Sequence, residues 1–148
     1  MMSCAALCER NLMPSGYSKR SLPEKLGIKP GFKMIILNPP SGYDSTLGEL
    51  PSNLRITKSL RGPLDFIHLF TSRRDELERE FPRLKGELAE DGMLWISWPK
   101  GSSKVETDLN EGVVREIGLR HRLVDIKVCA IDEIWAGLKF VYRLSGRG

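Results

Sequence analysis

The chain has 148 residues, of which 41% are hydrophobic, 28% charged and 7% aromatic. This length and composition fit one compact domain and exclude disordered, collagen-like and disulfide-framework proteins. The 23 lysines and arginines outnumber the 19 aspartates and glutamates, which gives a net charge of +4.

The excess positive charge is confined to the start of the chain. Residues 1–33 contain six Lys or Arg against two Asp or Glu, whereas residues 34–148 contain 17 of each. A nucleic-acid-binding protein needs a basic stripe on its folded surface, so we predict no nucleic-acid partner. No apolar run reaches the length that spans a bilayer, and the amino terminus shows no secretory signal. We therefore expect no membrane partner and a cytoplasmic location.

The first twenty residues predict no regular structure. They lack periodicity and include a Pro-Ser-Gly turn sequence, so we expect a poorly ordered N-terminal lead-in at residues 1–20. A regular pattern begins afterwards, and we expect a single α/β domain over residues 21–148. Ser21 followed by Pro23 is typical of a helix start.

Strands and helices are predicted in alternation along this domain. Strands are indicated by apolar runs of strand length, at residues 33–38, 54–57, 64–70, 93–98, 123–131 and 138–144. Further helices are indicated by apolar residues at helical spacing and by capping patterns, at residues 44–50, 72–88 and 108–117. Pro82 predicts a kink or a restart in the longest helix. Asp108 with Glu111 predicts a capping box, and Gly118 predicts a helix stop.

The alternation of buried strands with amphipathic helices is typical of a mostly parallel sheet that is covered on both faces. The last two strands are separated by too few residues for a crossover connection. We therefore expect them to pair antiparallel.

Two segments resemble Rossmann-like methyltransferases. The run KLGIKPG at residues 25–31 looks like the segment that leads into the first strand of that fold. The strand at 64–70 and the long helix lead to AEDGMLWI at residues 89–96, which is similar to the family's L-x-x-G-G-x-L turn and next strand. The resemblance implies an α/β, single-domain, three-layer Rossmann-like (methyltransferase-like) fold. It also implies a mostly parallel sheet with a C-terminal antiparallel strand pair.

The chain also resembles, over about residues 14–144, an uncharacterised bacterial family of domain-of-unknown-function proteins. The similar segments are G-Y-S, L-G-I-K-P-G, T-L-G-E-L-P, L-R-G-P-x-D, L-W-I-x-W-P-K and K-V-C-A-I-D-E. This resemblance is specific, but it implies no activity.

The cofactor-binding motif of methyltransferases is missing from this sequence. In that family a Gly-rich turn after the first strand approaches the ligand, and an acidic residue after the second strand binds the ribose hydroxyls. Here NPPSG at residues 38–42 follows the first strand, and its two prolines remove two donors. The second strand ends in ITK at residues 56–58 without a carboxylate, and one strand–helix unit before Leu64 is absent. We therefore predict no cofactor, and we interpret the NPP sequence as a rigid turn rather than a methyltransferase motif.

Ligands of open α/β sheets bind at the carboxyl ends of the parallel strands. That rule selects residues 38–44, 71–74, 99–104 and 129–135. The residues in these segments that can hold a small polar or anionic ligand are Asn38, Tyr43, Asp44, Arg73, Lys100, Asp132, Glu133 and Trp135. The competing interpretation is that Asp132 and Glu133 lie in a solvated turn and that Trp135 covers the sheet edge.

No arrangement of residues points to catalysis, and we predict no catalytic residues. Asp132 and Glu133 are adjacent, so on a strand they face opposite sides and cannot act as an acid–base pair. Ser72 and Ser97 have no histidine at a recognisable triad spacing, and His68, inside a buried strand, is expected to donate to the main chain. Three cysteines and two histidines without ligand spacing predict no metal site.

The favoured function is a non-catalytic small-ligand-binding or regulatory module on a degenerate methyltransferase-like scaffold, whose ligand is an unknown small molecule. The alternative is an enzyme that acts on a small polar substrate at the carboxyl edge, including an atypical S-adenosylmethionine-dependent methyltransferase. A third class is a homo-oligomer that forms through the exposed last strand, since an unpaired edge strand can accept another chain.

Overall fold

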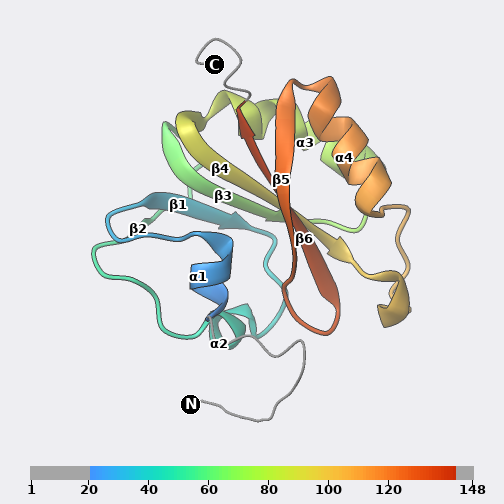
Figure 1. Cartoon of the computed structure of the whole chain (residues 1–148), viewed down its shortest axis with the longest axis horizontal. Helices are drawn as coiled ribbons and strands as arrows, with labels where there is room; N and C mark the ends of the chain where they lie inside the picture. The colour runs from blue at the N-terminus through green and yellow to red at the C-terminus, as the bar shows by residue number, and fades with distance from the viewer. Residues whose placement is uncertain (1–20, 143–148) are drawn as a thin grey trace.

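The computed structural model describes residues 21–142, which form a six-stranded sheet with helices on both faces (Figure 1). The predicted lead-in at residues 1–20 lies outside the described residues. The strands are β1 (Lys33–Leu37), β2 (Arg55–Ile56), β3 (Leu64–Phe70), β4 (Leu88–Pro99), β5 (Leu123–Ala130) and β6 (Trp135–Tyr142). The helices are α1 (Leu22–Leu26), α2 (Tyr43–Leu47), α3 (Arg74–Gly86) and α4 (Glu111–Arg120), with a 3-10 turn, η1, at Gly101–Ser103.

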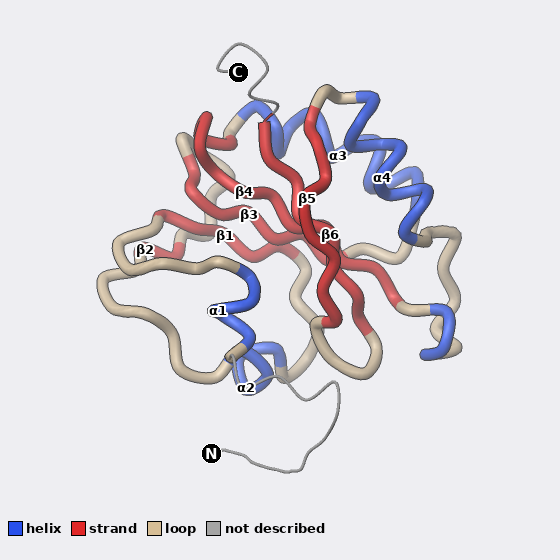
Figure 2. Tube along the Cα trace, viewed as in Figure 1, coloured by secondary structure: helices blue, strands red, loops and turns tan. Residues whose placement is uncertain are grey.

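The strands lie in the order β2-β1-β3-β4-β6-β5 (Figure 2). Strands β2, β1, β3 and β4 are mutually parallel, and β6 is antiparallel to both of its neighbours. Because β5 is antiparallel to β6, it runs in the same direction as β4. The predicted mostly parallel sheet with a C-terminal antiparallel pair is therefore confirmed.

The last strand is an interior strand rather than an edge of the sheet. On β6, Lys139 lies opposite Trp95 of β4 on one side and opposite Lys127 of β5 on the other. The expectation that the last strand is exposed is therefore wrong. The free edge on that side is β5, where Ile126 and Val128 are 55% and 48% exposed.

Two hydrophobic cores, one on each face, make the fold three-layered. Helices α3 and α4 cover one face, where Leu77 and Phe81 of α3 pack with Phe140 of β6. Helices α1 and α2 cover the other face, where the core includes Leu26, Tyr43, Leu47, Phe66, Phe70 and Trp95. No helix among residues 21–142 is long and apolar enough to cross a membrane.

The start of α1 follows the predicted pattern. The main-chain N–H of Glu24 donates to the Ser21 hydroxyl, and the main-chain N–H of Ser21 donates to the Glu24 carboxylate at 3.0 Å, which completes a capping box. At its other end, α1 is tied to the sheet because Nε1 of Trp95 donates to the main-chain oxygen of Leu26 at 2.9 Å.

The longer helices α3 and α4 differ from the sequence pattern, α3 at its internal proline and α4 at its capping residue. Helix α3 continues through Pro82 without a restart. Asn110, rather than Asp108, caps α4, since its side chain accepts from the main-chain N–H of Val113 at 2.9 Å. Asp108 instead accepts from the main-chain N–H of Arg74 at 2.7 Å, so it caps α3 from a distant loop.

The expected helix stop at Gly118 is also wrong, since α4 continues to Arg120. A Cβ atom at Gly118 would lie 2.0 Å from Cε1 of Phe140. The glycine therefore permits close packing of α4 on the sheet, which the sequence pattern did not distinguish from a C-cap.

Candidate functional site

An apolar cleft opens beside the carboxyl ends of β1 and β2, with a volume of about 380 Å³. Helix α2 forms one wall of this cleft. Most of the lining side chains are apolar, among them Leu37, Pro39, Leu47, Leu50 and Ile56. The polar residues at the cleft are Tyr43, Asp44, Thr57 and Lys58.

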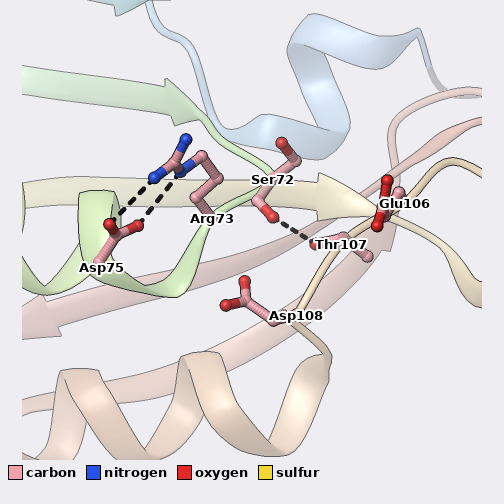
Figure 3. Close-up of a pocket in the computed structure, with 6 residues that line it drawn as sticks. All are labelled: Ser72, Arg73, Asp75, Glu106, Thr107 and Asp108. Carbon is pink, nitrogen blue, oxygen red and sulfur yellow. Dashed lines mark hydrogen bonds and ion pairs between the residues drawn. The ribbon is translucent and has the colours of Figure 1, made fainter.

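A second hollow, of about 730 Å³, lies beyond the carboxyl ends of β3 and β4 (Figure 3). We call it the polar hollow, and it is lined by Ser72, Arg73, Asp75, Glu106, Thr107 and Asp108. Its two walls are held together by hydrogen bonds. The Thr107 hydroxyl donates to the main-chain oxygen of Ser72 at 2.7 Å, and Asp108 caps α3 as described above.

The charged groups of the polar hollow are largely used in local contacts. Nε and Nη2 of Arg73 lie 3.3 and 3.1 Å from the two carboxylate oxygens of Asp75. This hydrogen bonding raises the pKa of Arg73 and lowers that of Asp75. Because both side chains are well exposed, water screens the pair and it adds little stability. With Glu106 and Asp108, the hollow carries a net negative charge.

A chain of three polar side chains crosses the core beneath the apolar cleft. The hydroxyl oxygen of Tyr43 lies 3.1 Å from Nδ1 of His68, and Nε2 of His68 lies 2.7 Å from Oγ of Ser97. His68 and Ser97 are fully buried, and Tyr43 is 3% exposed. His68 is thus a core residue as expected, but its partners are side chains rather than the main chain.

The side chains of Tyr43 and His68 are held in their neutral forms. Burial lowers the pKa of His68 to about 3, because the charged ring would lose its hydration. Burial also raises the pKa of Tyr43, and the nearby Asp132 and Cys129 raise it further. A serine–histidine pair without access to substrate cannot act as a nucleophile and base. We therefore interpret the three connected side chains as a structural element.

The eight predicted ligand-binding residues are divided between places rather than gathered in one cleft. Tyr43 and Asp44 line the apolar cleft, and Arg73 lines the polar hollow. Asn38 is exposed in a turn with a φ of 56°, and Glu133 is exposed on the β5–β6 connection.

The remaining three predicted residues shape the β5–β6 connection. The main-chain N–H of Lys100 donates to the main-chain oxygen of Ile134 at 2.7 Å. One carboxylate oxygen of Asp132 accepts from the N–H groups of Ile134 and Trp135, both at 2.8 Å. The Trp135 ring packs edge-on against Phe70, with centroids 5.2 Å apart. These contacts agree with a turn and a covered sheet edge.

The sequence pattern missed most of the residues that line the two hollows. Leu47, Leu50 and Ile56 look like ordinary core residues in the sequence, because the missing strand–helix unit before Leu64 does not by itself show which side chains it leaves uncovered. Glu106 and Thr107 lie several residues beyond the end of β4, outside the segment that the strand-end rule selects.

The loop beside the apolar cleft does not fit the way in which methyltransferases hold S-adenosylmethionine. Pro39 and Pro40 offer no N–H, and the N–H of Tyr43 is taken by the main-chain oxygen of Pro40. At the end of β2, the main-chain N–H of Thr57 is taken by Met34, and no carboxylate follows. Residues 57–63 join β2 to β3 without a helix, so the strand–helix unit predicted to be missing is absent from this connection.

The strand order and the antiparallel strand beside the edge define a Rossmann-like, methyltransferase-like α/β fold, and solved structures share it. A TehB-like SAM-dependent methyltransferase from Corynebacterium glutamicum superposes with a TM-score of 0.55 at 15% identity, over 82% of this chain and 85% of that one. The DhpI–SAH complex gives a TM-score of 0.58 at 10% identity, over 84% and 83% of the two chains. Magnesium protoporphyrin IX methyltransferase from Synechocystis, with bound SAH, gives 0.54 at 12% identity, over 77% and 75%.

These identities establish a shared fold and nothing further. No family model matches the chain, and no curated protein matches it in sequence.

Proposed function

We propose that this protein is a non-catalytic module that binds a small molecule in the apolar cleft. The observation that carries the proposal is the cleft itself. It lies at the carboxyl ends of parallel strands, where ligands of such sheets bind, and mostly apolar walls with a few polar groups are typical of small-molecule sites. The motif resemblance described above supports a bacterial protein of the same uncharacterised family, and we propose a cytoplasmic location for it.

The polar groups of the cleft indicate the kind of ligand. The Thr57 hydroxyl is used within its own turn, where it accepts from the N–H of Ser59 at 3.1 Å. Asp44 and Lys58 form no ion pair with any residue in the described range 21–142. The cleft therefore suits a molecule with an apolar body and a polar end that contacts one or both of these charged side chains.

The surroundings of the cleft favour binding without catalysis. Tyr43 lines the cleft, and its hydroxyl contacts the buried His68. Through this contact Tyr43 connects the cleft to the buried polar side chains. The ordinary pKa of tyrosine, 10.0, already keeps the phenol protonated at neutral pH, and burial raises the pKa of Tyr43 further. A general base needs a group that accepts a proton near the operating pH, which Tyr43 does not supply.

The alternative function is an enzyme that acts on a small polar substrate, including an atypical S-adenosylmethionine-dependent methyltransferase. The likeness of the fold to such methyltransferases supports this alternative. The proline-containing loop and the missing carboxylate weigh against it, and we derive no reaction step through that cofactor.

The proposal is tested with the fluorescent probe 1-anilinonaphthalene-8-sulfonate, which has an apolar body and an anionic end. We expect saturable binding to the folded protein, lost in Ile56→Trp because the larger ring fills the cleft. Val105→Trp is the matched control, since Ile56 and Val105 are exposed apolar residues, at 55% and 44%, and Val105 lies far along the chain in the loop after η1. Binding that survives Ile56→Trp, or no saturable binding, overturns the proposal.

The same experiment separates the two functions. S-adenosylmethionine and S-adenosylhomocysteine are added as competitors of the probe, with thermal unfolding as a second readout. If either compound displaces the probe and stabilises the wild-type protein but not Ile56→Trp, the alternative replaces the proposal.

We further propose that two copies of the chain associate through the β5 edge. This edge presents eight residues of main chain, with Ile126 and Val128 exposed beside it. Antiparallel pairing of two such edges would satisfy their free main-chain groups and cover these side chains.

A further inference from the structure

Three lysines gather on the face of the sheet that α1 covers. Lys127 and Lys139 lie directly opposite each other on β5 and β6. Nζ of Lys127 donates to the main-chain oxygen of Lys25 at 2.7 Å. Nζ of Lys139 lies beside Gly27, 3.3 Å from the position that a Cβ atom would take there. Lys29 is the third, because it follows Gly27 by two residues along the chain. Burial first, and then the charges of Lys127 and Lys29, lower the pKa of Lys139. We call Lys29, Lys127 and Lys139 the lysine patch.

The charges of the lysine patch are not neutralised within the described part of the chain. All ion pairs among residues 21–142 are made by arginines, and none involves a lysine of the patch. Like charges directly opposite on neighbouring strands destabilise a sheet. Lys127 and Lys139 are also half-buried, so solvent screens their repulsion less than it would at an open surface.

Attachment of α1 to the sheet explains only one member of the patch. A cation at the end of a helix stabilises its free carbonyl groups, and Lys127 does this at Lys25. The next carbonyl, of Leu26, is already taken by Nε1 of Trp95. Among the described residues, neither Lys139 nor Lys29 holds α1 through a hydrogen bond.

We propose that the lysine patch binds a phosphate group. A phosphate ester carries up to two negative charges and several acceptor oxygens, and lysine ammonium groups bind phosphate as point charges. One such group between Lys29, Lys127 and Lys139 would turn their mutual repulsion into attraction. No lysine of the patch lines the apolar cleft or the polar hollow, so this site is independent of the proposed small-molecule site.

The lysine patch also shows that the net charge of a sequence segment does not predict where basic residues gather on the folded protein. Lys29 belongs to the basic first 33 residues, whereas Lys127 and Lys139 belong to the part of the chain with no net charge. Folding brings the three together at one place. The expectation of no nucleic-acid partner rested on the linear tally, so the phosphate of a nucleic acid is included in the test beside that of a small molecule.

The test is isothermal titration calorimetry of the full chain with pyrophosphate and, separately, with a short single-stranded RNA, each at low and physiological salt. We expect binding that weakens with salt and that falls about tenfold in Lys139→Gln and in Lys29→Gln. Lys104→Gln is the control, because Lys104 is an exposed lysine in the turn after η1 and should leave binding unchanged. Lys29 is exposed, so its variant tests the site even if Lys139→Gln folds poorly.

The two probes also identify the source of the phosphate. Tighter binding of pyrophosphate supports a phosphorylated small molecule, and tighter binding of RNA with a steep salt dependence supports a nucleic-acid backbone. If neither probe binds, or if Lys29→Gln and Lys139→Gln bind as the wild-type protein does, the proposal is wrong.

Discussion

The hydroxyl oxygen of Tyr43 lies 3.1 Å from Nδ1 of His68, and this contact joins the short helix α2 to the central strand β3. Tyr43 also packs edge-on against Phe70, with ring centroids 4.8 Å apart. Helix α2 has only five residues, so its own hydrogen bonds cannot hold it in place. The Tyr43 side chain therefore fixes the wall of the apolar cleft to the core.

Replacing Tyr43 by phenylalanine should destabilise the protein by about 1–3 kcal/mol, because Nδ1 of the buried His68 loses its partner. Tyr142→Phe is a matched control: Oη of Tyr142 donates to the main-chain oxygen of Lys85 at 2.7 Å in a half-buried place. There water can replace the hydroxyl, so we expect a smaller loss. Urea unfolding measures both free energies, and equal losses would contradict the role given to Tyr43.

His68 should make the folded protein sensitive to acid. Its pKa is about 3 in the folded protein, against the ordinary histidine value of 6.5 in the unfolded chain, so between these values the unfolded chain binds a proton that the folded chain does not. Stability is therefore lost as pH falls, by about 1.4 kcal/mol for each pH unit in this range from this side chain alone. His68→Gln should flatten the curve of unfolding free energy against pH between 6.5 and about 3, relative to the wild-type protein.

His121 supplies the control for that measurement. Its pKa is also lowered, by burial first and then by Lys85 and Arg120, but the ring is partly exposed. His121→Gln should change the acid dependence much less than His68→Gln. A larger change in the His121 variant would refute the assignment to His68.

The arrangement of the sheet could be predicted from the sequence because its signals are local. The run at Leu64–Phe70 is almost wholly apolar, which is typical of a central parallel strand, and Ser21 with Glu24 carries its own capping pattern. The position of Gly118 could not be predicted in the same way. Its role depends on the Phe140 ring, which is distant in sequence and contacts this position in the folded protein.

The candidate site was less predictable than the fold for the same reason. The strand-end rule selected both Tyr43 and Arg73, but it could not show that they line different hollows. The lysine patch gave no sequence signal, because Lys29 and Lys139 are more than a hundred residues apart. The packing of the end of α1 on β5 and β6 brings them together.

Gly118→Ala should destabilise the protein, although alanine is the better helix former. A Cβ at this position would overlap the Phe140 ring, and overpacking of a core typically costs about 1–3 kcal/mol. Gly112→Ala, in the same helix, is the control: its Cβ would lie 3.4 Å from Oδ1 of Asn110, in ordinary contact. There we expect a gain of up to about 1 kcal/mol from helix propensity. The midpoints of thermal and of urea unfolding should therefore fall in Gly118→Ala and rise in Gly112→Ala.

Lys139 should make stability rise with pH in mildly alkaline solution. Its pKa in the folded protein is below the ordinary value of 10.5, so as pH rises the folded chain loses this proton before the unfolded chain does. The destabilising charge is therefore removed from the folded state first. We expect the difference in unfolding free energy between the wild-type protein and Lys139→Gln to shift in favour of the wild type as pH approaches 10.5. A difference that stays constant with pH would show that Lys139 experiences no such repulsion.

Association through the β5 edge predicts a dimer in sedimentation experiments. A charged side chain at a strand edge opposes edge-to-edge pairing, so Val128→Lys should shift the protein to the monomer. Val105→Lys is the control, because Val105 is exposed to a similar extent, 44% against 48%, on the loop after η1 and not on a strand. A wild-type protein that remains monomeric at all concentrations tested would exclude the β5 dimer. A dimer that persists in Val128→Lys would place the interface on another surface.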